Sequence, residues 1–254
     1  MVFRQDLRAS LGAAVGGGDP GLSTADRLCH ACVELLDVDG AAISLMHDGV
    51  TQGTFGSSGE LSRRLDEFQF TFGEGPCLEA VSQARPVLVA DLRDPRERRW
   101  PAYAGAVLEC GVRAVYALPV LVSTSYVGAL DLFRNKPGPL TGDGLVGGLL
   151  AAELAALPLL DLMSADVALA PDGEGEHGWD QLASLQRVEV YQATGMVMGQ
   201  LNVGSAEALV RLRAHAFAHD LTASEVAWAI VERRLRFDAD DKLRGPDGHT
   251  GAHS

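Results

Sequence analysis

The 254-residue chain lacks long apolar runs. No uninterrupted apolar stretch approaches the roughly 18 residues that a membrane-spanning helix needs. Asp6 and Asp19 lie where a secretory signal peptide would require an apolar segment without charge. The sequence therefore predicts a cytoplasmic protein with no membrane partner.

Cysteine is also scarce, with four residues in the whole chain. Four thiols are too few for a disulfide framework at this length, and a cytoplasmic compartment would keep them reduced. Cys29 and Cys32 have the C-x-x-C spacing of redox and zinc sites, but no second pair follows them. His215 and His219 are four residues apart without the glutamate of an H-E-x-x-H motif. We expect buried thiols, no metal site and no cofactor.

Positive charge is in deficit, since the formal net charge is -13. Such a chain repels phosphate at long range, which argues against a broad basic surface for nucleic acid. The deficit is uneven, because residues 181–237 contain six arginines and five acidic side chains, a net charge of +1. A nucleic-acid partner would have to be recognised there by a local arginine face and by contacts to unpaired bases.

Length and an apolar content of 47% predict two globular units. Helix-like and strand-like segments alternate in the first unit, and the pattern is helical throughout the second. The predicted fold class is α+β, an antiparallel sheet with packed helices, followed by an all-α three-helix bundle. The predicted organisation is a flexible N-terminus at 1–22, a mixed domain at 23–163, a linker rich in Gly, Asp and Glu at 164–179, a helical domain at 180–237 and a disordered tail at 238–254.

Local patterns assign elements within the first unit. Apolar residues at helical spacing predict helices over 24–38 and 142–163. The GEGPC segment at 73–77 lacks the glycines of phosphate-binding motifs and predicts a backbone turn before a helix. β-branched and aromatic residues bounded by glycine or proline predict strands within 40–49, 66–75, 85–92, 114–122 and 126–134.

The second unit is predicted to contain three helices. Asp180 is a candidate cap for a first helix that continues to about Leu201. Gly204 interrupts the pattern before a second helix begins. Thr222 and Glu225 form the S/T-x-x-E capping box of a third helix. Three short helices bury little surface alone, so we expect a homodimer.

The first two of these helices resemble the ANTAR family of RNA-binding transcription antiterminators. The resemblance is carried by R-x-x-V-x-Q-A-x-G-x-x-M from Arg187 to Met198 and by E-A-x-x-x-L-R-x-x-A from Glu207 to Ala216. Thr194 stands where the family usually has lysine. The resemblance implies a dimeric module that binds the loops of tandem stem-loops in nascent transcripts.

Candidate RNA contacts follow from this resemblance. Arg211 and Arg213 lie off the apolar stripe of the second helix, where solvent or RNA could reach them, although Arg211 could instead pair with Glu207. Trp228 could stack on an unpaired base or pack at a helix interface. Gly195 is expected where two helices approach closely. The candidate RNA-binding residues are Arg187, Gln192, Thr194, Arg211, Arg213 and Trp228.

The first unit resembles a GAF domain of the type found fused to ANTAR modules in actinobacteria. The carrying motifs, in order, are FTFGEGPCLEAV, PVLVADL, RWP, GVRAVYALPV and GALDLFR between residues 70 and 134. The resemblance implies a sensor or dimerisation domain with a possible small-molecule ligand. The candidate ligand-binding residues are Asp91, Arg99, Trp100 and Tyr103, in the loop that shapes the pocket of this fold. A loop clasped by its own tryptophan is the structural alternative.

Together the two resemblances imply a regulator without catalytic residues, in which the GAF domain controls the RNA-binding module. A DNA-binding transcription factor is one alternative, because a trihelical module could place a helix in the major groove. No helix carries a run of base-reading Arg, Asn and Gln, which counts against it. A redox-active GAF protein using Cys77 and Cys110 is the other, because some GAF-fold proteins reduce methionine sulfoxide. Cys110 is followed by Gly-Val-Arg-Ala-Val, without the acidic and hydroxyl residues of those enzymes.

Overall fold

A computed structural model describes residues 2–17, 22–47, 50–160, 187–238 and 243–244. The chain divides into two units, residues 1–186 and residues 187–254, and each is described by itself. The predicted linker at 164–179 lies outside the described residues. So does most of the predicted tail at 238–254.

A five-stranded antiparallel sheet organises the first unit, in the order β2-β1-β5-β4-β3. The alternation of strand residues sends Tyr116 and Leu118 of β4 to one face of the sheet and Val115 and Ala117 to the other. Both faces are apolar, so both must be covered. The strands are β1 (Gly40–His47), β2 (Val50–Ser57), β3 (Val87–Val89), β4 (Ala114–Val122) and β5 (Ser125–Arg134).

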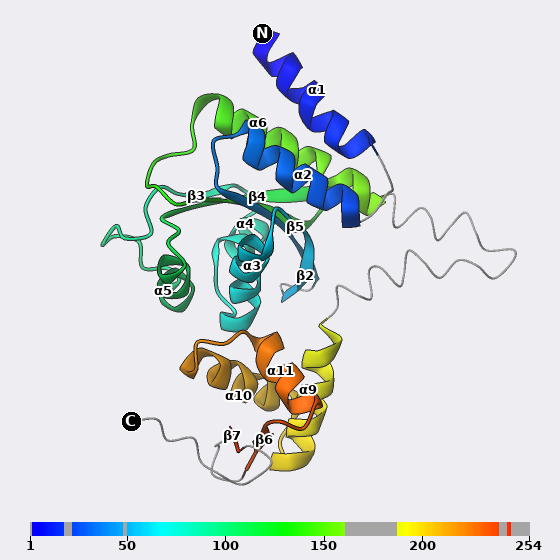
Figure 1. Cartoon of the computed structure of the whole chain (residues 1–254), viewed down its shortest axis with the longest axis vertical. Helices are drawn as coiled ribbons and strands as arrows, with labels where there is room; N and C mark the ends of the chain where they lie inside the picture. Colours follow the sequence, from blue (N-terminus) through cyan, green and yellow to red (C-terminus); the bar gives the residue numbers. More distant parts are fainter. Residues whose placement is uncertain (1, 18–21, 48–49, 161–186, 239–242, 245–254) are drawn as a thin grey trace, which may run out of the picture. The chain divides into compact units, whose positions relative to one another are not determined.

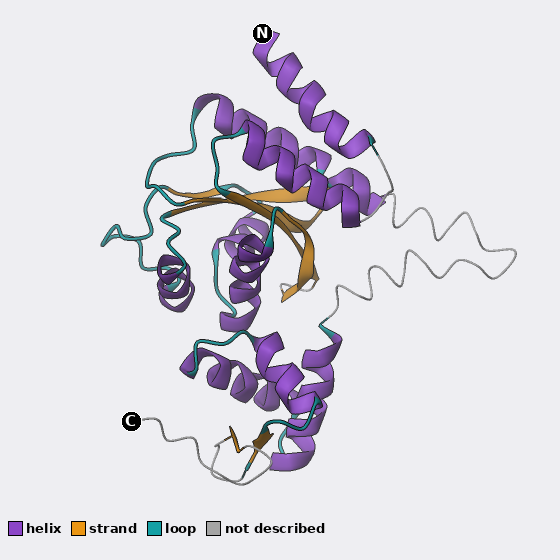
Figure 2. Cartoon of the chain, in the orientation of Figure 1, coloured by secondary structure: helices purple, strands orange, loops and turns teal. Residues whose placement is uncertain are grey.

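Helices cover both faces of the sheet (Figure 1). Figure 2 shows the sheet as the middle of three layers. Gly148 of α6 allows a close approach, because an added Cβ would lie 2.7 Å from Leu118 Cδ1. One face carries α2 (Leu22–Leu35) and α6 (Gly142–Leu154), and α1 (Val2–Gly16) packs on the outer side of these two helices; the other face carries α3 (Glu60–Phe72), α4 (Pro76–Gln83) and α5 (Pro101–Glu109).

The second unit is a bundle of three short helices, as predicted. Its core is made of small and β-branched side chains, and the buried members include Val190, Ala193, Val197, Ala208, Leu212, Ala216, Val226, Ala227 and Ile230. Its elements are α9 (Val188–Leu201), α10 (Ser205–Ala218), α11 (Ala223–Val231) and the short strands β6 (Arg236–Phe237) and β7 (Leu243–Arg244).

The predicted capping box of the third helix is confirmed. Thr222 is the N-cap of α11, and its side chain accepts a hydrogen bond from the Glu225 backbone N–H at 3.2 Å. The Glu225 carboxylate accepts one from the Thr222 N–H at 2.6 Å. Two backbone donors that the helix itself leaves unsatisfied are thereby paired.

The flexible N-terminus predicted at 1–22 is wrong for most of its length, because residues 2–16 form α1. Leu7 and Leu11 are four residues apart and lie on one side of the helix. They are 5% and 0% exposed, and they join the core formed with α2 and α6. Arg8 also pairs with Glu153 of α6 at 3.2 Å. The apolar pair fixes this segment on the domain.

The strand predicted at 66–75 is also wrong, since residues 60–72 form α3. Phe68, Phe70 and Phe72 alternate as in a strand, which produced the error. The helix buries Leu65 and Phe68, three apart, and ends at Gly73 in a left-handed conformation. Strand β2 was not predicted, because its sequence VTQGTFGS has few large apolar residues.

The apolar helix predicted at 142–163 is present, and it contains the charged residues Asp143 and Glu153. Gly142–Leu160 is long and apolar enough to cross a membrane by length and composition, the only such helix among the described residues. Gly147, Ala151 and Ala152 of this segment are buried against the sheet and its neighbouring helices. This is the behaviour of a core helix in a folded domain.

Two boundaries in the second unit differ from prediction. The first helix begins at Val188, because Arg187 has non-helical dihedral angles (φ -72°, ψ 67°), and residues 180–186 lie outside the described part. Within the tail predicted to be disordered, Leu243–Arg244 pairs as β7 with Arg236–Phe237.

Candidate nucleic-acid interface and sensor site

The ANTAR-like motif on α9 is divided between the core and the surface. Val190 and Ala193 are fully packed inside the bundle, at 2% and 0% exposure. Gln192 and Gly195 of the same motif are exposed. An added Cβ at Gly195 would meet no atom within 4 Å, so the expected close approach of two helices at Gly195 is wrong within the described unit.

Thr194 does not lie on the exposed face. Its side chain is 8% exposed, and its hydroxyl donates a hydrogen bond to the Val190 carbonyl at 2.7 Å. That hydrogen bond uses the only donor of the hydroxyl. Thr194 therefore lies in the bundle and not on its exposed face, and its contact with RNA stays a prediction.

Arg187, which directly precedes α9, lies near Arg213 of α10. Arg187 is 9% exposed, and Arg213 is half-buried. Burial, followed by the positive charge of Arg187, lowers the pKa of Arg213. The expectation that Arg213 projects freely from its helix is wrong, since α10 turns it toward Arg187 and Tyr191.

Arg211 forms the intrahelical ion pair that the sequence offered as its alternative role. Its Nη2 lies 2.7 Å from Glu207 Oε1, and its Nε lies 3.2 Å from the same oxygen. Exposed pairs of this kind are worth little stability. Arg211 is thus held along α10 with its charge partly balanced.

Trp228 is 51% exposed on α11, so it does not pack at a helix interface within the described unit. Of the candidate RNA residues, Gln192 and Trp228 are open, Arg211 and Arg213 are partly covered, and Arg187 and Thr194 are buried.

The segment after α11 folds back onto the bundle, which the sequence did not indicate. Phe237 is 2% exposed, its ring meets that of His215 edge-on, and its N–H donates to Gln200 Oε1 at 2.9 Å. His215 also stacks on His219 at 3.8 Å between ring centroids. Burial, and then the charge of His219, lowers the pKa of His215 to about 4. Phe237, an isolated aromatic before a polar tail, was the available signal.

The ligand-site candidates of the first unit do not converge on one pocket. Asp91 pairs with Arg113 at 2.8 Å, and a backbone hydrogen bond from Arg93 is the main reason that the pKa of Asp91 is lowered. Arg99 pairs with Glu79 at 2.8 Å and lies 4.2 Å from the Trp100 ring. The Arg99–Trp100 contact supports the alternative in which the loop is clasped by its own tryptophan, and Glu79 and Arg113 hold the loop from outside it.

Tyr103 differs from the other three candidates because it lies on α5, pointing into the domain. It is 0% exposed. Burial, followed by the charge of Asp131, raises the pKa of Tyr103 well above its ordinary value.

A buried polar cluster surrounds Tyr103 and was missed by sequence reasoning. Gln69 Nε2 donates to Asp131 Oδ2 at 2.6 Å, and Gln69 Oε1 accepts from the Cys77 N–H at 2.8 Å. Thr54 donates to Asp66 at 2.6 Å. Burial, and then the Asp66 charge, raises the pKa of Asp131 well above its usual range. The signal was an aspartate inside the apolar strand YVGALDLFR.

The predicted turn at 73–77 is confirmed, and it links the cluster to α5. Gly75 has φ +150°, and an added Cβ there would lie 2.7 Å from Gln69 Cγ. One carboxylate oxygen of Glu74 accepts hydrogen bonds from the backbone N–H groups of Ala102 and Tyr103, at 2.7 and 3.1 Å. An acidic side chain at a helix N-terminus stabilises that helix, so Glu74 holds the start of α5.

The cysteines do not have the environment of reactive thiols. Cys77 is fully buried beside Ser44 Oγ at 3.2 Å, and burial raises the pKa of its thiol well above the ordinary value. Burial also raises the pKa of the half-buried Cys110. A raised pKa leaves less thiolate, the reactive form. Among the described residues, no cluster of three or more His, Cys, Asp or Glu has the arrangement of a metal site.

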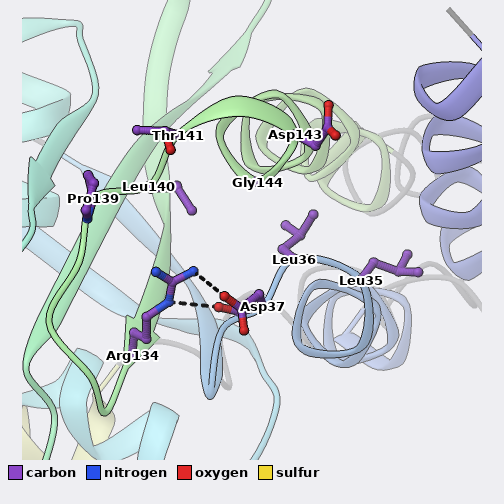
Figure 3. A pocket seen from close by; sticks show the side chains of 9 residues that line it. All are labelled: Leu35, Leu36, Asp37, Arg134, Pro139, Leu140, Thr141, Asp143 and Gly144. Atoms are coloured by element: carbon purple, nitrogen blue, oxygen red, sulfur yellow. Dashed lines mark hydrogen bonds and ion pairs between the residues drawn. The ribbon is translucent and has the colours of Figure 1, made fainter.

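Described residues of the first unit line two pockets away from these candidates. The larger, about 360 Å³, lies between the end of α2 and the start of α6 and contains the Asp37–Arg134 ion pair at 2.9 Å (Figure 3). The other, about 220 Å³, adjoins the start of α3. Neither is lined by a predicted ligand residue.

The fold and the site define a class of protein: a mixed α/β domain joined to a small helical module. A GAF domain model matches residues 23–157, and an ANTAR domain model matches residues 181–231. The chain therefore belongs to the GAF domain family and carries an ANTAR domain after it. This architecture is that of a regulator of the ANTAR family, whose members bind RNA.

Solved structures share the fold of the first unit. The GAF domain of a phosphoenolpyruvate-protein phosphotransferase from Coxiella burnetii is 16% identical, with a TM-score of 0.50 over 63% of this chain and 95% of that one. The corresponding domain from Acinetobacter is 10% identical, with a TM-score of 0.48 over 64% and 96%. A free methionine-R-sulfoxide reductase from Neisseria meningitidis is 13% identical, with a TM-score of 0.47 over 65% and 92%. No curated protein matches the chain.

Proposed function

We propose that the protein is a cytoplasmic RNA-binding regulator that acts by transcription antitermination. In this proposal the helical module, as a homodimer, holds the loops of two neighbouring stem-loops in a nascent transcript. The terminator hairpin then cannot form. The GAF domain responds to a small molecule and controls the module.

The division of the motif on α9 carries this proposal. Val190 and Ala193 serve the core, whereas Gln192 and Gly195 have no packing role inside the unit. An exposed glutamine amide offers two donors and an acceptor to base edges. Unpaired loop bases present such edges, whereas the deep, narrow groove of paired RNA hides them.

For the sensor, the contacts favour Tyr103 over Asp91, Arg99 and Trp100. Those three residues hold the loop that precedes α5. Tyr103 joins α5 to the buried polar cluster, so a ligand that displaces α5 would alter its surroundings directly.

RNA titrations at two salt concentrations test the function. The full chain should bind a tandem stem-loop more tightly than the same stems with scrambled loops or a DNA duplex. The low charge predicts a shallow salt slope, about -0.7 in log K against log salt for each single-stranded phosphate neutralised. Gln192→Ala should weaken loop binding, while the control Val210→Ala, on the exposed side of α10, should not. Equal binding of scrambled loops would contradict the proposal, and preference for the duplex would favour a DNA-binding regulator.

A further inference from the structure

Tyr191 on α9 has an exposure that packing does not explain. Its side chain is 60% exposed, more than Phe217 at 55% or Trp228 at 51%. Gln192, the next residue, is exposed as well, so the outward side of α9 includes both side chains. A large aromatic in that position is costly to leave in water and is typical of a contact surface.

The backbone beside Tyr191 is open. Gly195 and Gly199 follow it at intervals of four residues, which places all three on one row of α9. An added Cβ would meet no atom within 4 Å at either glycine. Glycine weakens a helix interior relative to alanine. These two glycines therefore cost stability without allowing any close contact among the described residues, which indicates a partner that approaches from outside.

The charge next to this row indicates the nature of the partner. The Tyr191 N–H donates a hydrogen bond to the Arg187 carbonyl at 3.1 Å, which places Arg187 one helical turn before Tyr191. Arg187 and Tyr191 both influence the pKa of Arg213 on α10. An aromatic ring beside two neighbouring guanidinium groups combines a stacking surface with attraction for an anion. A nucleotide offers both complements, a flat base and a phosphate.

We propose that Tyr191 is a base-stacking residue of the RNA interface, with Arg213 attracting the adjoining phosphate. The inference rests on the proposed function and adds a specific contact to it. An unpaired loop base lies on the tyrosine ring, and the sugar-phosphate backbone approaches the helix over Gly195 and Gly199. Stacking accepts any base, so Tyr191 contributes affinity for unpaired bases while Gln192 reads their edges.

The test compares Tyr191→Ala, Tyr191→Phe and the matched control Phe217→Ala in the full chain. The probe is a tandem stem-loop RNA with 2-aminopurine, a fluorescent base quenched by stacking, in one loop. Loss of one stacking contact is expected to weaken binding by about 5-fold to 150-fold. Tyr191→Ala should show this loss together with altered 2-aminopurine quenching. Tyr191→Phe should retain both properties of the wild type, because the ring is kept, and Phe217→Ala should bind normally.

The outcomes separate this inference from the proposed function. If the wild type binds loop RNA and Tyr191→Ala binds it equally well, the stacking role is overturned and the function stands. If the wild type binds no loop RNA, both fall. Sedimentation of each variant without RNA measures its oligomeric state and so tests whether Tyr191 lies in a dimer interface. A dimer that Tyr191→Ala converts to monomers would assign this face to a second copy of the chain, which also overturns the inference.

Discussion

The two units of this chain differ in where they place their hydrogen-bonded polar groups and their aromatic rings. The first buries Gln69, Asp131 and Tyr103 completely, in a cluster between its sheet and helices. The second fills its core with alanine and valine and leaves Tyr191 and Trp228 in solvent. A buried polar cluster is sensitive to small displacements, because each lost hydrogen bond leaves a desolvated group. An exposed aromatic surface is suited to a partner. The difference matches a sensor joined to a binding module.

Gln69→Leu should have the largest effect, confined to the first unit. It removes the hydrogen bonds to Asp131 and to the Cys77 N–H and leaves both groups buried. The expected loss is about 2–5 kcal/mol of unfolding free energy. Hydrogen exchange followed by mass spectrometry in urea reports the two units separately. The control Gln192→Leu, at an exposed position of α9, should change stability by less than about 0.5 kcal/mol. Equal losses in both variants would contradict the structural role of the cluster.

Rising pH should weaken the first unit through Asp131. Burial raises the pKa of this carboxyl in the folded state above its unfolded value of about 3.9. A raised folded pKa favours folding below the unfolded pKa, and the benefit is lost as pH rises through the folded pKa. Asp131→Asn keeps a neutral side chain and should flatten the dependence. The melting temperature of the first unit, measured from acidic to alkaline pH, checks this prediction. If Asp131→Asn shows the same pH dependence as the wild type, the dependence arises from other groups.

Falling pH should weaken the second unit through His215. Its folded pKa of about 4 lies below the ordinary value of 6.5. Its stabilising contribution is therefore present above 6.5 and lost as pH falls toward 4. Because the ring is half-buried, we expect about 1–2 kcal/mol after allowance for solvent screening. His215→Gln should remove this acid sensitivity, whereas His30→Gln, exposed on α2, should leave it intact.

Local sequence signals predicted the elements better than they predicted the sites. The capping box at Thr222 is a contact between residues three apart, so the sequence contains it entirely. Gln69 and Asp131 are 62 residues apart, and their contact exists only after the sheet forms. The alternation of Phe68, Phe70 and Phe72 led to a wrong strand prediction. Helix α3 is buried on more than one side, so its apolar residues do not show a clear helical period. Thr194 was expected on the exposed face but is buried. The motif shows which positions correspond to the family, but not which of them face the core.

Gly195→Ala should stabilise the second unit and weaken RNA binding. A helix interior is more stable with alanine than with glycine by about 0.5–1 kcal/mol. The added methyl group would meet no atom within 4 Å. The same methyl would stand between the helix and an approaching RNA backbone. Gly204→Ala, at the N-cap of α10, is the control for a glycine substitution away from this row. Tighter RNA binding by Gly195→Ala would show that the open backbone serves no partner.

Glu207→Gln should have the smallest effect on stability. The ion pair with Arg211 at 2.7 Å joins two partly exposed side chains on one helix, and such pairs contribute about 0.3–0.5 kcal/mol. Removing the carboxylate also raises the net charge of the second unit and takes the Glu207 ion pair away from Arg211. If Arg211 belongs to the RNA interface, binding should tighten slightly and the salt slope should steepen by part of one phosphate contact. Glu232→Gln, which breaks the Arg234–Glu232 pair at the end of α11, is the matched control. Identical salt slopes for Glu207→Gln and Glu232→Gln would mean that Arg211 contributes only to the general charge of the unit.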